Sequence, residues 1–235
     1  MRIASAVVDR TLPPPGLAGL APAAMVVARE GRAVTAHYGS VATELAVCRK
    51  SVGLALRTEL RVLEVAGRAA WLERLLSRAL GGTVPEPGSA AVAAGTWCLR
   101  VEAERALVVG PSGAFERWRR VAREAVIGGS PIVATERTDD WTPVSLIGPK
   151  APRLLELTGL SGDLPVRALS AGALEGGETL LLRAGADHWL LLIAGAFDAD
   201  AGRALLDAGR AVGLSLVGYD AVGRLAAAAR PAALL

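Results

Sequence analysis

The sequence predicts an α+β fold in which mixed and antiparallel sheets are covered by packed helices. Two observations lead to this fold class. Apolar strands repeatedly end at a glycine and are followed at once by an amphipathic helix. Other apolar strands come in pairs joined by short polar turns, and such hairpins require antiparallel pairing. Because a doubly wound parallel sheet would show only the first pattern, the mixture favours α+β.

The strand–glycine–helix pattern occurs four times, at Gly67, Gly110, Gly148 and Gly195. The nearly regular spacing of these glycines indicates one strand–helix unit that is used repeatedly. The strands that precede them are Arg61–Val65, Ala106–Val109, Val144–Ile147 and Trp189–Ala194.

The helices that follow place apolar residues on one face at a 3.6-residue period. We expect the first helix to end at Gly81, in a left-handed C-terminal cap. Ser112 is the expected N-cap of the second helix, and Pro149 suits the first turn of the third. Asp198 is the expected cap of a fourth. The apolar faces of the first two helices comprise Leu72, Leu75, Leu76, Ala79 and Leu80, and Phe115, Trp118, Val121, Ala122 and Ala125.

Two hairpins are predicted between these units. Thr96–Val101 pairs with Ala106–Val109, and Glu178–Arg183 pairs with His188–Ile193. With 235 residues, of which 52% are hydrophobic and 21% charged, the chain is too apolar to be disordered and long enough to bury one core. We expect a single domain over residues 25–235, with room for two sublobes, after an N-terminal extension of residues 1–24.

Composition also limits the partners. The net charge is +3, and no basic run is interleaved with aromatic residues, so no nucleic-acid partner is expected. The apolar run over residues 16–28 is too short to span a bilayer and is not part of a clean targeting segment. We therefore expect a cytoplasmic protein with no membrane partner. Cys48 and Cys98 are isolated, and two histidines without a carboxylate pair do not make a metal site, so no metal is expected.

No complete catalytic motif is present. The phosphate-binding sequences GxxxxGKS, GxxxxGKT and GxGxxG are absent, which argues against the usual ATP and NAD enzymes. Ser112 misses the spacing of a GxSxG nucleophile elbow by one residue. Asp139 and Asp140 form a pair of adjacent carboxylates, but their polar neighbours favour a solvated loop over acid–base catalysis.

One segment carries a recognisable pattern. It reads His37-Tyr38-Gly39-Ser40-Val41, then Glu44, Ala46-Val47, Arg49 and Val52-Gly53-Leu54, and closes with Val62 to Gly67. This pattern resembles the opening of the glycine-cleavage T-protein, the tetrahydrofolate-dependent aminomethyltransferase. Here Leu45 replaces the family's histidine, and Leu56 or Arg57 stands where an aspartate usually follows.

Two later motifs follow in the family's order. Leu146–Ala151 resembles its strand, Gly-Pro and helix signature, and Ala208–Ala221 is similar to its Gly-Leu and Gly-Leu-Asp-Ala close. The three matches cover most of residues 25–225. The resemblance implies the folate-binding T-protein domain without the C-terminal barrel. The chain length and the run Ala106–Pro111 also resemble the gamma subunit of heterotetrameric sarcosine oxidase, a compact relative within a larger complex.

The same resemblance implies that the catalytic acid is missing. The family's aspartate pair corresponds to the stretch Thr96–Leu99, and the asparagine of its Val-Asn turn corresponds to Gly110. The pterin-holding loop is reduced to Arg183–Asp187. The implied cofactor is tetrahydrofolate. The expected binding residues are Tyr38, Trp97, Asp187 and Tyr219.

Two hypotheses for function remain open. In the first, the chain is a divergent, non-catalytic or complex-dependent subunit linked to tetrahydrofolate-dependent one-carbon metabolism. Its partners would be a folate or another small ligand, together with oxidase- or demethylase-type subunits or a second copy of the chain. In the second, a stand-alone enzyme uses the same pocket for different chemistry on a small metabolite, with His188 or Asp220 as the catalytic group. A purely structural role is a third reading.

Overall fold

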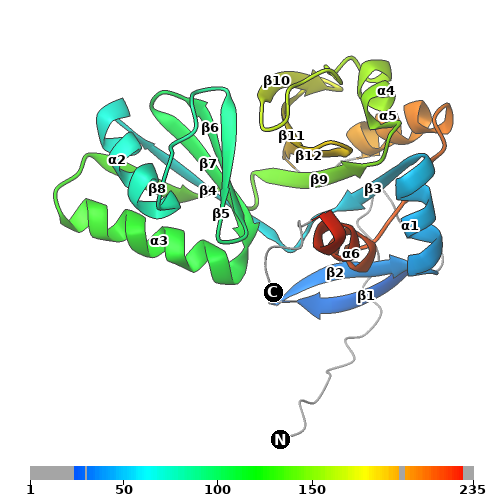
Figure 1. Ribbon diagram of the computed structural model, residues 1–235, viewed down its shortest axis with the longest axis horizontal. Coiled ribbons are helices and arrows are strands. Elements are labelled where there is room, and N and C mark those ends of the chain that lie inside the picture. Colours follow the sequence, from blue (N-terminus) through cyan, green and yellow to red (C-terminus); the bar gives the residue numbers. More distant parts are fainter. Residues whose placement is uncertain (1–23, 30, 196–198, 230–235) are drawn as a thin grey trace, which may run out of the picture.

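The computed structural model describes residues 24–29, 31–195 and 199–229. Two sheets face each other across a shared apolar layer and carry helices on their outer faces, and a smaller unit lies next to the second sheet (Figure 1). The predicted α+β class is confirmed. Of the predicted N-terminal extension, residues 1–24, the structure describes only Ala24, and the expected helix cap Asp198 also lies outside the described residues.

The first sheet is antiparallel throughout, in the strand order β5-β6-β7-β4-β8. Helices α2 and α3 pack on one of its faces. The bounds are β4 (Leu60–Gly67), α2 (Ala69–Leu80), β5 (Ser89–Ala93), β6 (Thr96–Glu102), β7 (Arg105–Pro111), α3 (Ser112–Ile127) and β8 (Ile132–Glu136).

The second sheet has the strand order β10-β11-β12-β9-β3-β13. Its strands pair antiparallel except for β13 and β3, which run parallel. The bounds are β3 (Val52–Leu56), β9 (Trp141–Ile147), α4 (Ala151–Leu157), β10 (Leu169–Leu174), β11 (Gly177–Gly185), β12 (His188–Ala194), α5 (Ala199–Arg210) and β13 (Leu214–Leu216).

The two sheets are built from one repeated unit. In each, a strand and a helix are followed by three strands, a second helix and a last strand: β4-α2-β5-β6-β7-α3-β8 and β9-α4-β10-β11-β12-α5-β13. The strand order within the sheets is also the same, except that β3 is inserted between β9 and β13. The repeated strand–glycine–helix pattern in the sequence is therefore the trace of this duplicated topology.

A smaller unit flanks the second sheet. The hairpin of β1 (Ala24–Arg29) and β2 (Arg32–Tyr38) packs against α6 (Tyr219–Ala229), and α6 packs against α1 (Val41–Lys50). Segments from the two ends of the described chain thus come together here (Figure 1).

The apolar core forms layers. Strand β7 shows the pattern, because Ala106 and Val108 face α2 and α3, whereas Leu107 and Val109 face the second sheet. On the second sheet, Leu180 and Leu190 belong to the inter-sheet layer. The unbroken apolar run of β7 thus follows from burial of both faces of the strand.

One predicted helix end is confirmed, and two predicted helix starts are wrong. Helix α2 ends at Gly81, in the predicted left-handed conformation with φ +70°. Ser112 is not the N-cap of α3 but its first residue, and Pro111 holds the cap position. Pro149 precedes the third helix, whose first turn contains Pro152 instead. Both corrections arise because proline suits the positions flanking a helix start, where no N–H is needed.

A tight joint precedes α4. Gly148 has φ +135°, and a Cβ there would approach the carbonyl oxygen of Ser51 to 2.2 Å. Its N–H donates to the carbonyl of Asp187 at 2.8 Å, in the turn between β11 and β12. Only glycine fits where these three segments meet.

Within the part of the chain that the structure describes, none of the helices combines the length and the apolar character needed to cross a bilayer.

Candidate functional site

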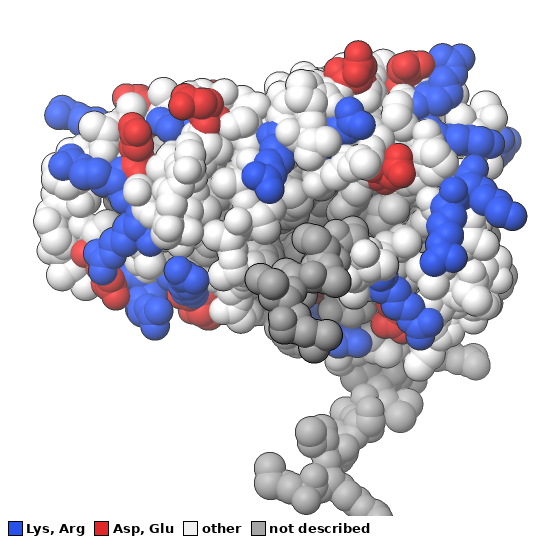
Figure 2. Space-filling view, viewed as in Figure 1, with Lys and Arg blue, Asp and Glu red and all other residues white. Residues whose placement is uncertain are grey.

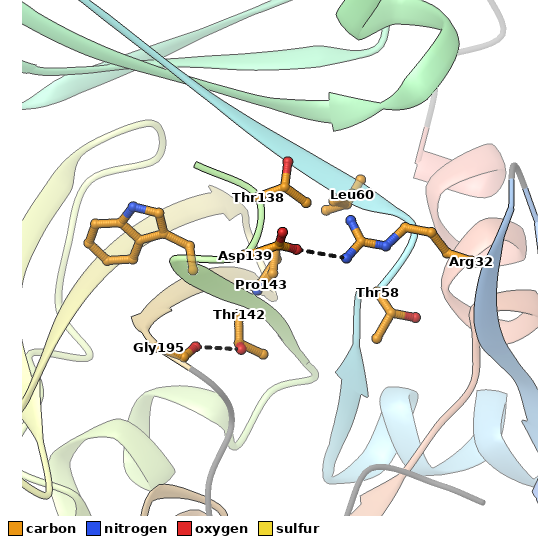
Figure 3. A pocket seen from close by; sticks show the side chains of 9 residues that line it. Arg32, Thr58, Leu60, Thr138, Asp139, Thr142, Pro143 and Gly195 are labelled. Carbon is orange, nitrogen blue, oxygen red and sulfur yellow. Dashed lines mark hydrogen bonds and ion pairs between the residues drawn. The ribbon is translucent and has the colours of Figure 1, made fainter. Parts of the chain in front are cut away.

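An open pocket of about 200 Å³ lies where the β1–β2 hairpin meets the two sheets (Figure 3). Its walls come from β2, the β3–β4 link, the β8–β9 turn, β9 and the end of β12. Arg32 reaches across toward Asp139, with 3.7 Å between the charged atoms. The lining residues are Arg32, Thr58, Leu60, Thr138, Asp139, Trp141, Thr142, Pro143 and Gly195.

The pocket lining combines an exposed carboxylate, several hydroxyl groups and a buried tryptophan. Asp139 is almost fully exposed, as the predicted solvated loop requires, so its ion pair with Arg32 is weak. The hydroxyl of Thr142 donates to the carbonyl of Gly195 at 2.8 Å and ties β9 to the end of β12. Trp141 lies in the layer between the sheets and is only 7% exposed.

A polar cluster, here called the Arg57 cluster, lies at the link between β3 and β4 and consists of Arg57, Glu59, Ser145 and His188. Arg57 Nε donates to Glu59 Oε1 at 2.5 Å, and its Nη1 donates to Ser145 Oγ at 3.1 Å. Ser145 Oγ in turn lies 3.0 Å from His188 Nε2. Thr58, which lies between Arg57 and Glu59 in sequence, lines the pocket, whereas none of the four cluster residues does.

The environment keeps His188 neutral at pH 7. Burial, and to a smaller extent the nearby positive charge of Arg57, together lower the pKa of this imidazole to about 4. Ser145 has one hydroxyl proton. It satisfies both neighbours when it accepts from Arg57 and donates to the unprotonated Nε2 of His188.

Glu59 is the least satisfied member of the cluster. Its Oε1 accepts from Arg57, but its Oε2 is buried and has no hydrogen-bond partner among the described residues. Most buried carboxylate oxygens in proteins have a donor, so this atom requires an explanation.

A second buried carboxylate holds the smaller unit together. Glu44, on α1, accepts the backbone N–H of Tyr38 at one oxygen and that of Gly218 at the other, the latter at 2.9 Å. These bonds join α1 to the end of β2 and to the start of α6. Beside them the guanidinium of Arg29 lies 4.5 Å from the centre of the Tyr219 ring.

The structure brings two of the four predicted cofactor-binding residues near each other. Glu44 accepts the backbone N–H of Tyr38 and that of Gly218, the residue before Tyr219. Burial raises the pKa of the Tyr38 phenol. Trp97 lies instead on β6, against the layer between the sheets, and Asp187 is exposed in the β11–β12 turn. Asp220, the second catalytic candidate, lies partly exposed in the first turn of α6.

The stretch Thr96–Leu99 offers no acid. It lies in β6, where Thr96, Cys98 and Leu99 are fully buried. Gly110 lies in β7, directly against the Thr96 side chain. Burial raises the pKa of the Cys98 thiol to about 12, so at neutral pH the group is a thiol and not a nucleophilic thiolate.

Cys48 is similar, because burial and the charge of Glu44 raise the pKa of its thiol to about 11.

Over the residues described, no three histidine, cysteine, aspartate or glutamate side chains are placed to hold a metal ion. On the face shown in Figure 2, basic side chains lie at both ends of the molecule, at the end that carries α1 and α5 and at the end that carries α2 and α3.

Of the Arg57 cluster, sequence reasoning named His188 as a catalytic candidate and Arg57 only as a departure from the family pattern, and it missed Glu59 and Ser145. Arg57 and Ser145 are 88 residues apart, and no short motif joins them. A charged pair, Arg57 and Glu59, directly between two apolar strands was the one local signal. Glu44 was noticed only as part of a family pattern.

The fold is similar to that of glycine cleavage system aminomethyltransferase T from Bartonella henselae, with a TM-score of 0.70 and 18% sequence identity. The alignment covers 90% of this chain and 61% of that one, so this chain spans less than two thirds of the aminomethyltransferase. Heterotetrameric sarcosine oxidase from Corynebacterium sp. U-96 contains a similar chain, with a TM-score of 0.57 and 18% identity, over 73% of this chain and 91% of that one. No family model and no curated protein matches the sequence.

Proposed function

We propose that this chain, whose fold is that of the aminomethyltransferase T-protein, is a non-catalytic or complex-dependent subunit linked to tetrahydrofolate-dependent one-carbon metabolism. The link to folate rests on the T-protein-like fold. The subunit role is supported by the second similarity, which extends over 91% of a chain from a heterotetrameric oxidase. The larger aminomethyltransferase is matched over 61% of its length.

The observation that carries the non-catalytic part is the protonation chemistry of the buried groups. General acid–base catalysis works best with a pKa near the working pH. His188, with a pKa of about 4, is a weak base at neutral pH, and the thiols of Cys48 and Cys98 stay protonated. The stretch Thr96–Leu99 supplies no carboxylate in place of the family's acid.

A second candidate is a stand-alone enzyme, favoured by one observation. Ser145 Oγ and His188 Nε2 are 3.0 Å apart, which is the spacing of a nucleophile and its base. Against this, Ser145 is fully buried and its hydroxyl also accepts from Arg57. A fluorophosphonate probe separates the two readings, because labelling of Ser145 that is lost in Ser145→Ala requires an accessible, activated serine.

Calorimetric titration with tetrahydrofolate and 5-formyltetrahydrofolate, beside a measurement of molar mass by light scattering, tests the first proposal. We expect the isolated chain to bind these folates weakly or not at all, and to form no product from 5,10-methylenetetrahydrofolate and an amine acceptor. Micromolar binding by a monomer would contradict dependence on a complex. Turnover by the isolated chain would contradict a non-catalytic role.

A further inference from the structure

The first sheet ends in a strand whose outer edge is open. Within the described chain, β8 pairs only with β4, on its inner side. The opposite edge of the sheet is partly covered, because the N–H of Ala90 on β5 donates to the carbonyl of Arg167, before β10, at 2.8 Å. An open edge presents unpaired backbone groups to any other strand, and native sheets usually protect it.

The sequence of β8 lacks the features that protect an edge. The strand contains no lysine, proline or bulge, and three of its five residues are β-branched, as is typical of strands. Val133, on the strand, is 65% exposed, and Ile127, at the end of α3 just before it, is 80% exposed. They are the two most exposed large apolar side chains among the described residues, so this edge is apolar as well as open.

The backbone groups that point outward can be identified. The N–H of Arg137 donates to the carbonyl of Val62 at 2.8 Å, which continues the pairing of β4 with β8 by one residue. Hydrogen bonding to the two sides alternates along a strand. The N–H and C=O groups of Ala134 and Glu136 therefore point away from β4, toward the open edge.

A second copy of the same strand fits this edge. Two identical antiparallel strands are related by a two-fold axis, which makes the interface self-complementary. With the axis at Ala134, its N–H donates to the carbonyl of Ala134 in the second copy, and the reverse bond forms as well. Val133 then lies opposite Thr135 of the second copy on both sides of the axis, and β-branched pairs of this kind stabilise sheets.

The charges are compatible with this pairing. Glu136 is the one charged residue of β8, and within its own chain it already pairs with Arg61 at 3.3 Å and with Arg119 at 3.7 Å. In this register Glu136 lies opposite Ile132 of the second copy. The two copies of Glu136 are four residues apart along the strands, about 13 Å, which exceeds the screening length of about 8–10 Å. No like charges meet on the paired strands.

We propose that the outer edge of β8 is the interface with a second copy of this chain, and that the two first sheets join across a two-fold axis into one antiparallel sheet. This inference goes beyond the proposed function and does not depend on it, because edge pairing requires neither a folate nor an oxidase subunit. The strand supplies five residues, fewer than the roughly 20–30 residues a side of a standard interface, so we expect a reversible dimer.

Sedimentation velocity on the full chain, over a series from low micromolar to submillimolar concentrations, tests the proposal. We expect the molar mass to rise from 24.1 kDa toward twice that value. Val133→Lys should raise the dissociation constant of the dimer about tenfold or more, because it removes two cross-strand pairs and places two like charges near the axis. Val92→Lys is the matched control, since Val92 is 48% exposed on β5, and it should leave this constant unchanged.

A second variant and a second measurement test the backbone directly. Ala134→Pro removes an N–H that points away from β4, and proline is tolerated on edge strands at such positions. It should weaken the dimer while the thermal unfolding midpoint stays near that of the wild type. In amide exchange followed by NMR, Ala134 and Glu136 should be protected only where the dimer forms, whereas Val133 and Thr135, which bond to β4, should be protected at every concentration.

Three results would overturn the proposal. The first is a chain that stays at 24.1 kDa throughout the series. The second is a dimer that neither Val133→Lys nor Ala134→Pro weakens, or that Val92→Lys weakens equally. The third is protection of Ala134 and Glu136 that appears only when a different subunit is added, because the edge then belongs to that subunit and not to a second copy.

Discussion

Acidification should destabilise the protein through His188. Its pKa is about 4 in the folded chain, against an ordinary value of 6.5. Each pKa unit corresponds to about 1.4 kcal/mol, so this one group makes the free energy of unfolding depend on pH by about 3 kcal/mol. This part of the free energy of unfolding is fully present above pH 6.5, where the His188 ring is neutral in both the folded and the unfolded chain. It is lost as pH falls from 6.5 to 4, because the unfolded chain binds the proton first.

Urea unfolding at a series of pH values, compared between the wild type and His188→Gln, isolates this contribution, since carboxylates elsewhere affect both proteins alike. The difference between the two unfolding free energies should narrow by about 3 kcal/mol across that window. Proton NMR supplies the direct reading, because the chain has two histidines and His37→Gln leaves the His188 signal alone. A ring that titrates near pH 6.5, or a difference that does not change with pH, would refute the argument.

Three further predictions concern stability and reactivity. Glu44→Gln should lower the free energy of unfolding in urea by about 1–3 kcal/mol, since an amide nitrogen cannot accept the backbone N–H that a carboxylate oxygen accepts; an unchanged midpoint would contradict this. Gly148→Ala should lower the free energy of unfolding, measured by thermal unfolding, by about 3 kcal/mol or more. Gly31→Ala should lower it by about 1 kcal/mol, because the left-handed position of Gly31 has open space around it. Equal losses in the two variants would show that the backbone around Gly148 relaxes. Cys48 and Cys98 should react with a thiol reagent at pH 8 only at the rate of unfolding, and immediate reaction of either would show that it is accessible.

The sequence predicted elements better than it predicted their neighbours. Strand β7 was recognisable because burial of both faces leaves an unbroken apolar run, and the end of α2 because Gly81 adopts a left-handed cap. The insertion of β3 between β9 and β13 was not predictable, since pairing between distant strands leaves no local pattern.

The candidate site was less predictable for the same reason. His188 was noticeable as one of two histidines, but its partner Ser145 looks like any small residue within an apolar strand. The pKa of His188 depends on burial and on Arg57, and neither is a property of the local sequence. Similarly, the exposure of Asp187 follows from its place in the β11–β12 turn.

The inserted strand β3 has a consequence for how the chain folds during synthesis. Every strand of the first sheet lies within residues 60–136, so that sheet can form while the rest is still being made. The second sheet must wait, because β3 stays without β9 and β13 until the ribosome has delivered them. The hydroxyl of Ser51, just before β3, donates to the carbonyl of Val212, shortly before β13, and these two residues are 161 apart in the sequence. Until then the backbone N–H and C=O groups along both edges of the apolar strand β3 are unpaired and can bond to wrong partners. Folding of the second sheet should therefore be the slow, aggregation-prone step.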